Sequence, residues 1–225
     1  MGDIHGCLSS FERLLAAIKA DDAARAPART TLILLGDLVD RGPDSRGVVE
    51  RALHLGFEFP ASVLIKGNHE EIMLAAAEGD RSSLQLFNRV GGRETMLSYG
   101  VDPRTYDEAS LEELAVLIDE RVPAAHRLFL DAGRDQVTIG DYLFVHAGIR
   151  PSVPLEAQRA ADLRWIREPF LSHRAAHAAM VVHGHTITEE PDVRANRIGI
   201  DTGAYAGGPL TAIGLEGSER WFLTD

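Results

Sequence analysis

Five short segments of the sequence place residues that can bind metal ions next to glycine. They are Gly2-Asp-Ile-His-Gly6, Gly36-Asp37, Gly67-Asn-His-Glu70, His146-Ala-Gly148 and Gly184-His-Thr186. One such pair is typical of an ordinary turn, in which Asp or Asn hydrogen-bonds the local backbone. Five of them, offering carboxylate, amide and imidazole groups but no thiolate, instead predict a metal centre with oxygen and nitrogen ligands.

Four of these segments directly follow apolar runs that predict β-strands. The runs are residues 31–35, 62–65, 142–145 and 180–182, and helical patterns separate them. This alternation predicts βαβ units around a largely parallel sheet. Binding sites in such sheets form beyond the carboxyl ends of the strands, so the ligands are expected at one edge. Asp3 and His5 are two apart on an extended segment, point to the same side and can hold one ion.

Two helix starts are predicted from capping boxes, in which a Ser side chain and a Glu three residues later satisfy the first backbone N–H groups. One is Ser9 with Glu12, and the other is Ser110 with Glu113. The second lies within residues 79–135, which predict a mainly helical insertion. We therefore expect a single domain over residues 1–225 that contains this insertion.

The composition predicts a soluble globular protein. Of the 225 residues 45% are hydrophobic, and no apolar run approaches the roughly 18 residues that a membrane helix needs. The formal net charge of −11 argues against nucleic-acid binding, which depends on a surplus of Lys and Arg. The single cysteine, Cys7, excludes an internal disulfide framework. With no secretory signal pattern visible, a cytoplasmic location and no membrane partner are expected.

Taken in this order, the segments resemble the sequence blocks of the phosphoprotein phosphatases, a branch of the calcineurin-like metallophosphoesterases. Asp201-Thr-Gly203 and Leu210-Thr-Ala-Ile213 are similar to the closing strands of the bacterial and phage-type Ser/Thr protein phosphatases. The resemblance covers nearly the whole chain. It implies an α/β sandwich of two mixed β-sheets flanked by helices.

The resemblance also implies two divalent metal ions and their ligands. Asp3, His5 and Asp37 would bind one ion, while the other would be bound by Asp37, Asn68, His146 and His185, with Asp37 bridging the pair. Mn²⁺ is the expected ion for oxygen and nitrogen ligands, with Fe or Zn as alternatives.

Phosphoryl oxygens would be held by Arg41, Arg167 and Asn68, and Arg164 is a close competitor of Arg167. Arginine suits this role because its planar guanidinium makes bidentate bonds and stays charged at every relevant pH. Such local positive charge would let a strongly acidic protein bind an anion.

The chemistry of phosphate esters explains why two ions are expected. Hydrolysis of a phosphate monoester can require acceleration of up to about 10²¹-fold, whereas a general base alone contributes roughly 10²- to 10⁴-fold. Two ions about 3.5 to 4 Å apart lower the pKa of a bound water and clamp the phosphoryl oxygens, so a metal-bridging hydroxide is the expected nucleophile. His69 is expected to protonate the leaving group, with Asp40 bonding its other ring nitrogen to hold the tautomer.

Three functions follow from this set of residues. The first is a Ser/Thr protein phosphatase acting on a phosphorylated protein or a small phosphoester. The second is a symmetrical bis(5'-nucleosyl)-tetraphosphatase, which uses the same catalytic segments. The third, of another class, is a catalytically impaired module that only binds phosphorylated partners; its single support is the start of the sequence.

The related enzymes have an apolar strand before the first segment, and only Met1 precedes it here. Either the true start lies upstream of Met1 or the first metal site is weakened.

Two further residues are interpreted as structural. His183 lies two positions before His185 and is expected to pack in the core or to contact the ligand residues without binding a metal ion itself. Trp165 is expected in the core rather than as a platform for substrate.

Overall fold

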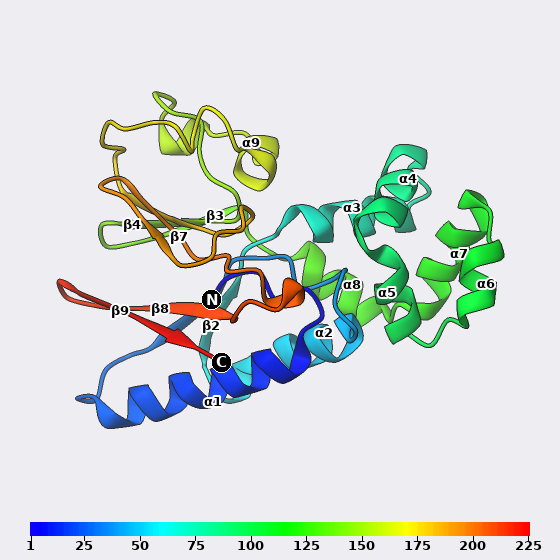
Figure 1. The fold of residues 1–225 in the computed structure, drawn as a ribbon, viewed down its shortest axis with the longest axis horizontal. Coiled ribbons are helices and arrows are strands. Elements are labelled where there is room, and N and C mark those ends of the chain that lie inside the picture. Colours follow the sequence, from blue (N-terminus) through cyan, green and yellow to red (C-terminus); the bar gives the residue numbers. More distant parts are fainter.

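A five-stranded mixed sheet forms the upper of two β-layers in the computed structural model, which describes residues 1–225 (Figure 1). Its strand order is β3-β4-β5-β7-β6, and β4, β5 and β7 run parallel while β3 and β6 are antiparallel edges. The strands are β3 (Gln136–Ile139), β4 (Tyr142–Val145), β5 (Met180–His183), β6 (Asp192–Val193) and β7 (Arg197–Gly199). A segment containing α9 (Ala160–Trp165) covers the outer face, where Leu163 and Phe170 pack on Leu143 and Val181.

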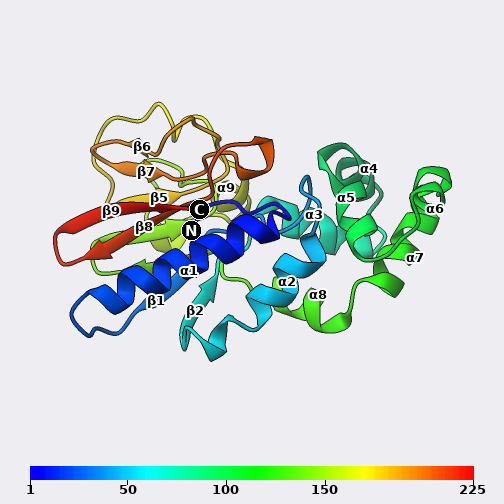
Figure 2. The ribbon, with the colours of Figure 1, turned by 60° about the horizontal axis from the view of Figure 1, so that its bottom comes forward.

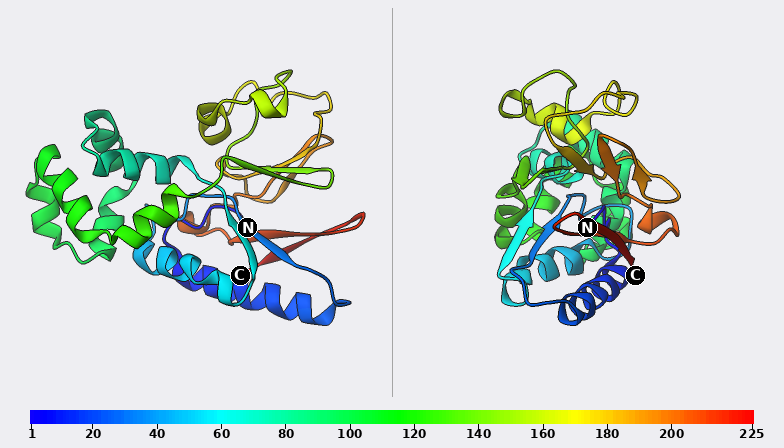
Figure 3. Two further views of the ribbon diagram at one scale, coloured as in Figure 1. Left: turned by 180° about the vertical axis from the view of Figure 1, so that it is seen from behind. Right: turned by 90° about the vertical axis from the view of Figure 1, so that its left-hand side faces the viewer.

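The second layer consists of two short pairs of strands. β1 (Thr31–Leu34) and β2 (Ala61–Leu64) are parallel, whereas β8 (Thr211–Glu216) and β9 (Glu219–Thr224) form an antiparallel hairpin. The two layers enclose a cluster of seven buried apolar residues: Ile33, Leu35, Ile65, Phe144, Val182, Ile198 and Ile200. The end-on view in Figure 3 shows the layers stacked above α1. This sandwich of mixed sheets confirms the fold class, and the four strands predicted first lie where the apolar runs placed them.

The extended segment at Met1–Gly2 joins the two pairs of strands. The Met1 amino group donates to the Ile33 carbonyl at 2.9 Å, and the Leu35 N–H donates to the Met1 carbonyl at 3.0 Å. On the other side, the Gly2 N–H donates to Thr211 of β8 at 2.9 Å. A largely apolar cavity lies beside Met1 and is lined by residues of β1 and β8, among them Ile33 and Ile213. These bonds fix the direction in which Asp3 and His5 leave the layer.

Helices α1 (Leu8–Ala24) and α2 (Ser45–Leu53) lie below the second layer in Figure 1, and Figure 2 turns this side toward the viewer. The predicted capping box of Ser9 and Glu12 is wrong, because the helix begins two residues earlier, with Cys7 as N-cap and no side-chain cap. Gly6, with φ of 66°, turns the chain from the first segment directly into the helix, so Ser9 already lies in the first turn.

The region predicted as an insertion is helical and forms the lobe at the right of Figure 1. After α3 (Asn68–Ala77), it contains α4 (Arg81–Val90), α5 (Gly92–Ser98), α6 (Pro103–Glu108), α7 (Leu111–Arg121) and α8 (Ala124–Asp131). The second predicted capping box is confirmed: Ser110 and Glu113 bond each other's backbone N–H groups at the start of α7. None of the helices combines the length and the apolar character that crossing a bilayer requires.

Substitution of Gly92 would measure how tightly the helical lobe is packed. A Cβ on Gly92 would lie 2.5 Å from the ring of Phe87, a fully buried residue of α4. We expect Gly92→Ala to lower the free energy of unfolding by about 1 to 3 kcal/mol, as over-packing does. Gly56→Ala is the matched control, because nothing lies within 4 Å of its Cβ. Urea denaturation of both variants measures the difference, and equal midpoints would show that the lobe is loosely packed.

Candidate active site

The predicted site is marked by an unusual concentration of left-handed backbone. Of the six non-glycine residues with positive φ, five are predicted site residues: His5, Asp37, Asp40, Arg41 and His185. Each such conformation costs on the order of 1 to 3 kcal/mol, and such strain clusters at functional sites. The strain is independent of the sequence motifs and identifies the same region.

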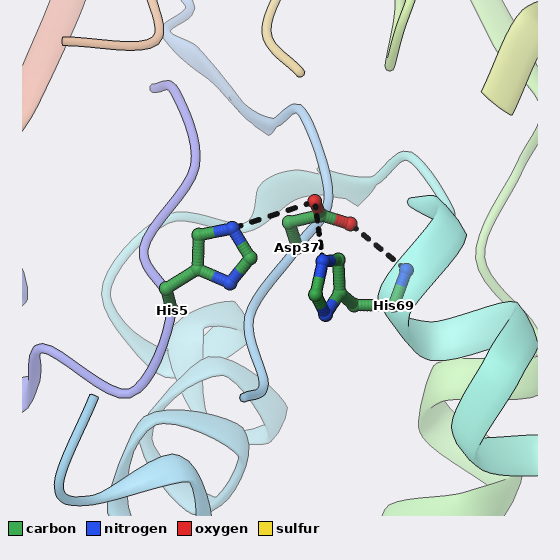
Figure 4. Close-up of side chains that lie close together, drawn as sticks. All are labelled: His5, Asp37 and His69. Carbon is green, nitrogen blue, oxygen red and sulfur yellow. Dashed lines mark hydrogen bonds and ion pairs between the residues drawn. The ribbon is translucent and has the colours of Figure 1, made fainter. Parts of the chain in front are cut away.

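One group of metal-ligand atoms comprises His5, Asp37 and His69, all buried (Figure 4). His5 Nε2 and His69 Nε2 lie 3.5 and 3.9 Å from Oδ2 of Asp37. His5 Nδ1 lies 2.8 Å from the Val39 carbonyl, which accepts its proton and leaves Nε2 with a free lone pair. Burial lowers the pKa of His5 to about 3, so its ring is neutral and able to bind a metal.

A second group comprises Asp37, His146 and His185, so the two groups share Asp37. Nε2 of His146 lies 2.9 Å from Oδ1 of Asn68, 3.2 Å from Nδ1 of His185 and 3.4 Å from Oδ1 of Asp37. Nδ1 of the same ring lies 2.8 Å from the Leu35 carbonyl, which again directs the other nitrogen inward. Four ligand atoms from four different loops therefore converge here.

Asp3 lies at the edge of these groups. Its Oδ2 accepts the backbone N–H of His185 at 2.9 Å, while its buried Oδ1 has no hydrogen-bond partner. Burial and the nearby Asp201 raise the pKa of Asp3 above its ordinary value. The sequence predicts Asp3, His5 and Asp37 as the ligands of one ion, whereas the closely spaced group in the structure contains His69 in place of Asp3. Gly184 is required beside it, because a Cβ there would lie 2.0 Å from Oδ1 of Asp3.

The donor atoms fit divalent metal ions. Two buried atoms without partners, Oδ1 of Asp3 and Nε2 of His5, are lone-pair donors that a cation would satisfy. Burial alone would raise the pKa of Asp37, but the neighbouring His146 and His69 hold it well below its ordinary value, so the shared carboxylate is ionised. The set contains oxygen and nitrogen but no sulfur, as ions such as Mn²⁺ prefer.

His69 and Asp40 form a hydrogen-bonded dyad beside the ligand groups. Nδ1 of His69 lies 2.7 Å from Oδ2 of Asp40, and both side chains are buried. Although burial opposes it, the Asp37 and Asp40 carboxylates raise the pKa of His69. The hydroxyl of Thr95 on α5 donates to the other Asp40 oxygen at 2.7 Å, and the Asp40 N–H contacts both Thr95 and Ser45. Neither hydroxyl was predicted, and no sequence pattern links Thr95 to Asp40, which is 55 positions away.

Glu70 is a second residue whose role the sequence did not reveal. Its buried carboxylate accepts the backbone N–H groups of Asp37 at 2.8 Å, Leu38 at 2.7 Å and Gly67 at 2.9 Å. These bonds tie the loop after β1 to the loop after β2. The relative position of the two loops therefore depends on the buried Glu70 carboxylate.

The two arginine candidates differ in their surroundings. Arg164 forms ion pairs with Glu71 and Asp135, which occupy its guanidinium. Arg167 is exposed and forms no ion pair. Burial, His146 and, to a smaller extent, the charge of Arg167 lower the pKa of His185 to about 3, so Arg167 lies near that ring. The geometry thus favours Arg167 as the residue available to an anion.

The remaining residues of interest lie around the site. His183 is buried with its ring edge against Phe170 and its Nδ1 3.0 Å from the Gly184 carbonyl, which matches the predicted packing role. The expectation for Trp165 was wrong: it is 37% exposed, and its indole N–H donates to Glu71 at 2.6 Å. The indole N–H needs a hydrogen-bond acceptor, which the Glu71 carboxylate provides and an apolar core would not, so the ring lies at the surface at the end of α9.

The fold and these groups define a metal-dependent phosphoesterase. The family model for calcineurin-like phosphoesterases matches residues 1–204, so the chain belongs to that family. This confirms the resemblance inferred from the motifs and assigns the chain to the enzymes, so the reading as a binding-only module is not supported.

The relatives include symmetrical and asymmetrical bis(5'-nucleosyl)-tetraphosphatases and a serine/threonine-protein phosphatase. A symmetrical bis(5'-nucleosyl)-tetraphosphatase from Acidovorax sp. (strain JS42) is 37% identical over 151 residues, which are 67% of this chain and 43% of the relative. Serine/threonine-protein phosphatase 1 from Salmonella typhimurium is 30% identical over 216 residues, covering 94% of this chain and 88% of the relative. The match to the Acidovorax enzyme spans less than half of that relative's length.

A crystal structure assigned provisionally to a diadenosine tetraphosphatase shares the fold. It superposes with a TM-score of 0.67 at 24% identity and covers 99% of this chain and 90% of the other. At this identity the likeness establishes the architecture and leaves the substrate open.

Replacing Glu70 tests whether its carboxylate holds the two loops together. In Glu70→Gln an amide NH₂ would face backbone N–H groups, and a buried unsatisfied donor costs about 1 to 3 kcal/mol. We expect a lower unfolding free energy by that amount in urea denaturation. Glu78→Gln, an exposed residue at the end of the same helix, is the control. Equal stability of the two variants would contradict the role of Glu70.

Metal binding should depend on Asp37 because both groups share its carboxylate. For the wild-type chain, Mn²⁺ at 100 times its dissociation constant should stabilise the fold by about 2.7 kcal/mol. Asp37→Asn should lose most of this shift and contain less metal after purification. Thermal denaturation and elemental analysis measure both, with Asp107→Asn, in an exposed ion pair with Arg93, as the control. Unchanged metal content in Asp37→Asn would exclude the shared carboxylate as a ligand.

Proposed function

We propose that this chain is a phosphomonoester hydrolase of the Ser/Thr protein phosphatase type that acts on phosphorylated protein. The observation that carries the proposal is the His69–Asp40 dyad, whose ring nitrogen lies 3.9 Å from the carboxylate shared by two ligand groups. A proton donor at that position serves an alkoxide leaving group, such as the side chain of Ser or Thr, which leaves poorly without a proton.

Asp3, His5, Asp37, Asn68, His146 and His185 would hold the two ions, for which we propose Mn²⁺. When bound, such ions supply a water of lowered pKa as nucleophile and neutralise the phosphoryl oxygens. The carbonyls of Val39 and Leu35 keep His5 and His146 in the tautomer that presents Nε2 to the site. Asp40 accepts the hydrogen bond from Nδ1 of His69 and stabilises the doubly protonated ring, whose Nε2–H would donate to the leaving oxygen.

Arg41, Arg167 and Asn68 would bind the phosphoryl oxygens. In this structure an Arg41 nitrogen lies 3.1 Å from Nε2 of His69, so the guanidinium already reaches the proton donor. This places its charge beside the buried carboxylates, in a chain whose net charge is −11. Local rather than overall charge would therefore attract the anionic substrate.

The Salmonella phosphatase supports the protein phosphatase assignment, because its match extends over nearly the full length of both chains. Symmetrical hydrolysis of dinucleoside tetraphosphates is the second candidate, since the relative with 37% identity has that activity. A cytoplasmic location stays a prediction from the sequence.

The leaving group provides a test of His69. The metal-stripped chain should be inactive on p-nitrophenyl phosphate and regain activity with Mn²⁺, and Asp37→Asn should abolish that recovery. His69→Asn should lower kcat by about 10²- to 10⁴-fold on a phosphoserine peptide. The loss on p-nitrophenyl phosphate should be smaller, because nitrophenolate leaves without needing a proton. Equal losses on both substrates would contradict His69 as the acid.

Product analysis separates the two candidate activities. Incubation with phosphoserine peptides and with a dinucleoside tetraphosphate, followed by chromatography, should show free phosphate from the peptide at the higher kcat/KM. Nucleoside diphosphates formed at the higher kcat/KM would instead establish the tetraphosphatase activity.

A further inference from the structure

A rigid turn after β7 projects Tyr205 over the site. The turn η3 (Ala204–Ala206) lies between two left-handed glycines, Gly203 with φ of 70° and Gly207 with φ of 93°. The Gly203 N–H donates to the Asp201 carboxylate at 3.1 Å, and the Gly208 N–H closes the turn onto the Gly203 carbonyl at 3.1 Å. These bonds fix the backbone that carries Tyr205.

The Tyr205 ring contacts two residues of the predicted site. Its edge-to-face contact with His5 has ring centroids 5.2 Å apart, and the Arg41 guanidinium carbon lies 4.6 Å from the Tyr205 ring centroid. The ring is 36% exposed, and its hydroxyl forms no hydrogen bond. Its interaction with the site is therefore made by the ring, which suits a cation–π contact.

Arg41 has few other restraints on its side chain. Its backbone is fixed, because its φ is 69° and its N–H donates to Gly91 at 3.2 Å. Its guanidinium contacts only Nε2 of His69, at 3.1 Å, and the Tyr205 ring. The Tyr205 ring is therefore one of the two contacts that restrain the guanidinium.

We propose that Tyr205 is a positioning residue that holds the Arg41 guanidinium over the ligand groups for capture of the phosphoryl group. The inference rests on the proposed phosphate-binding role of Arg41. It adds that the ring face of Tyr205, and not its hydroxyl, sets the affinity of the site for the phosphoryl group.

Binding of inorganic phosphate to the Mn²⁺-loaded chain tests this inference, measured by calorimetry and as competitive inhibition. Tyr205→Leu should weaken phosphate binding by about 2- to 30-fold, the range of a cation–π contact, and raise KM by a similar factor with a smaller change in kcat. Tyr205→Phe keeps the ring face and should restore wild-type phosphate binding. Phe57→Leu, at an aromatic residue 86% exposed on η1 (Leu55–Phe57), is the matched control.

The Arg41→Ala background distinguishes positioning from a general structural effect. If Tyr205 acts through Arg41, adding Tyr205→Leu to Arg41→Ala should not weaken phosphate binding further. An equal loss in Tyr205→Phe and Tyr205→Leu, or a full further loss in the double variant, would overturn the inference while leaving Arg41 as a phosphate ligand. Wild-type phosphate binding in Arg41→Ala would instead overturn the proposed role of Arg41, and this inference with it.

Discussion

The buried carboxylate of Asp37 is the constraint on which the rest of the site depends. It is 2% exposed and has imidazole nitrogens of His5, His69 and His146 within 3.9 Å. A buried, ionised carboxylate is stabilised only where protons or cations lie beside it. Against the effect of burial, the Asp37 carboxylate raises the pKa of His146 to about 10, so a proton on His146 can fill this role, and a metal ion bound to the same ring would replace that proton.

Much of the surrounding structure serves to hold this carboxylate and its neighbours. Glu70 bonds the Asp37 and Leu38 N–H groups, and Gly67 allows the second loop to approach, because a Cβ there would lie 2.1 Å from Oδ1 of Asp37. Two parallel strands deliver these loops side by side, from β1 and β2. Left-handed residues around the site indicate that packing elsewhere compensates for local strain.

The strands and the ligand residues were predictable because each leaves a local signal. Apolar runs followed by glycine and a polar ligand identify both a strand and its carboxyl end, and β1, β2, β4 and β5 lie there. The residues that support the ligands leave no such signal. The Thr95 hydroxyl bonds the Asp40 carboxylate although the two residues are 55 positions apart. The Tyr205 ring contacts the Arg41 guanidinium although the two residues lie in different loops. These contacts depend on tertiary packing, which spacing along the chain does not encode.

The start of α1 shows the same limit on a smaller scale. Ser9 and Glu12 have the spacing of a capping box, but the turn at Gly6 begins the helix earlier. Tertiary placement of the first ligand segment thus overrides a local capping preference. The box at Ser110 has no such constraint and forms as the sequence predicts.

Anomalous diffraction from crystals grown with Mn²⁺ would test the shared-carboxylate centre most directly. The account predicts two anomalous peaks about 3.5 to 4 Å apart, one on each side of Asp37 and both within bonding distance of its carboxylate. A single peak, or two peaks of which one does not contact Asp37, would contradict it.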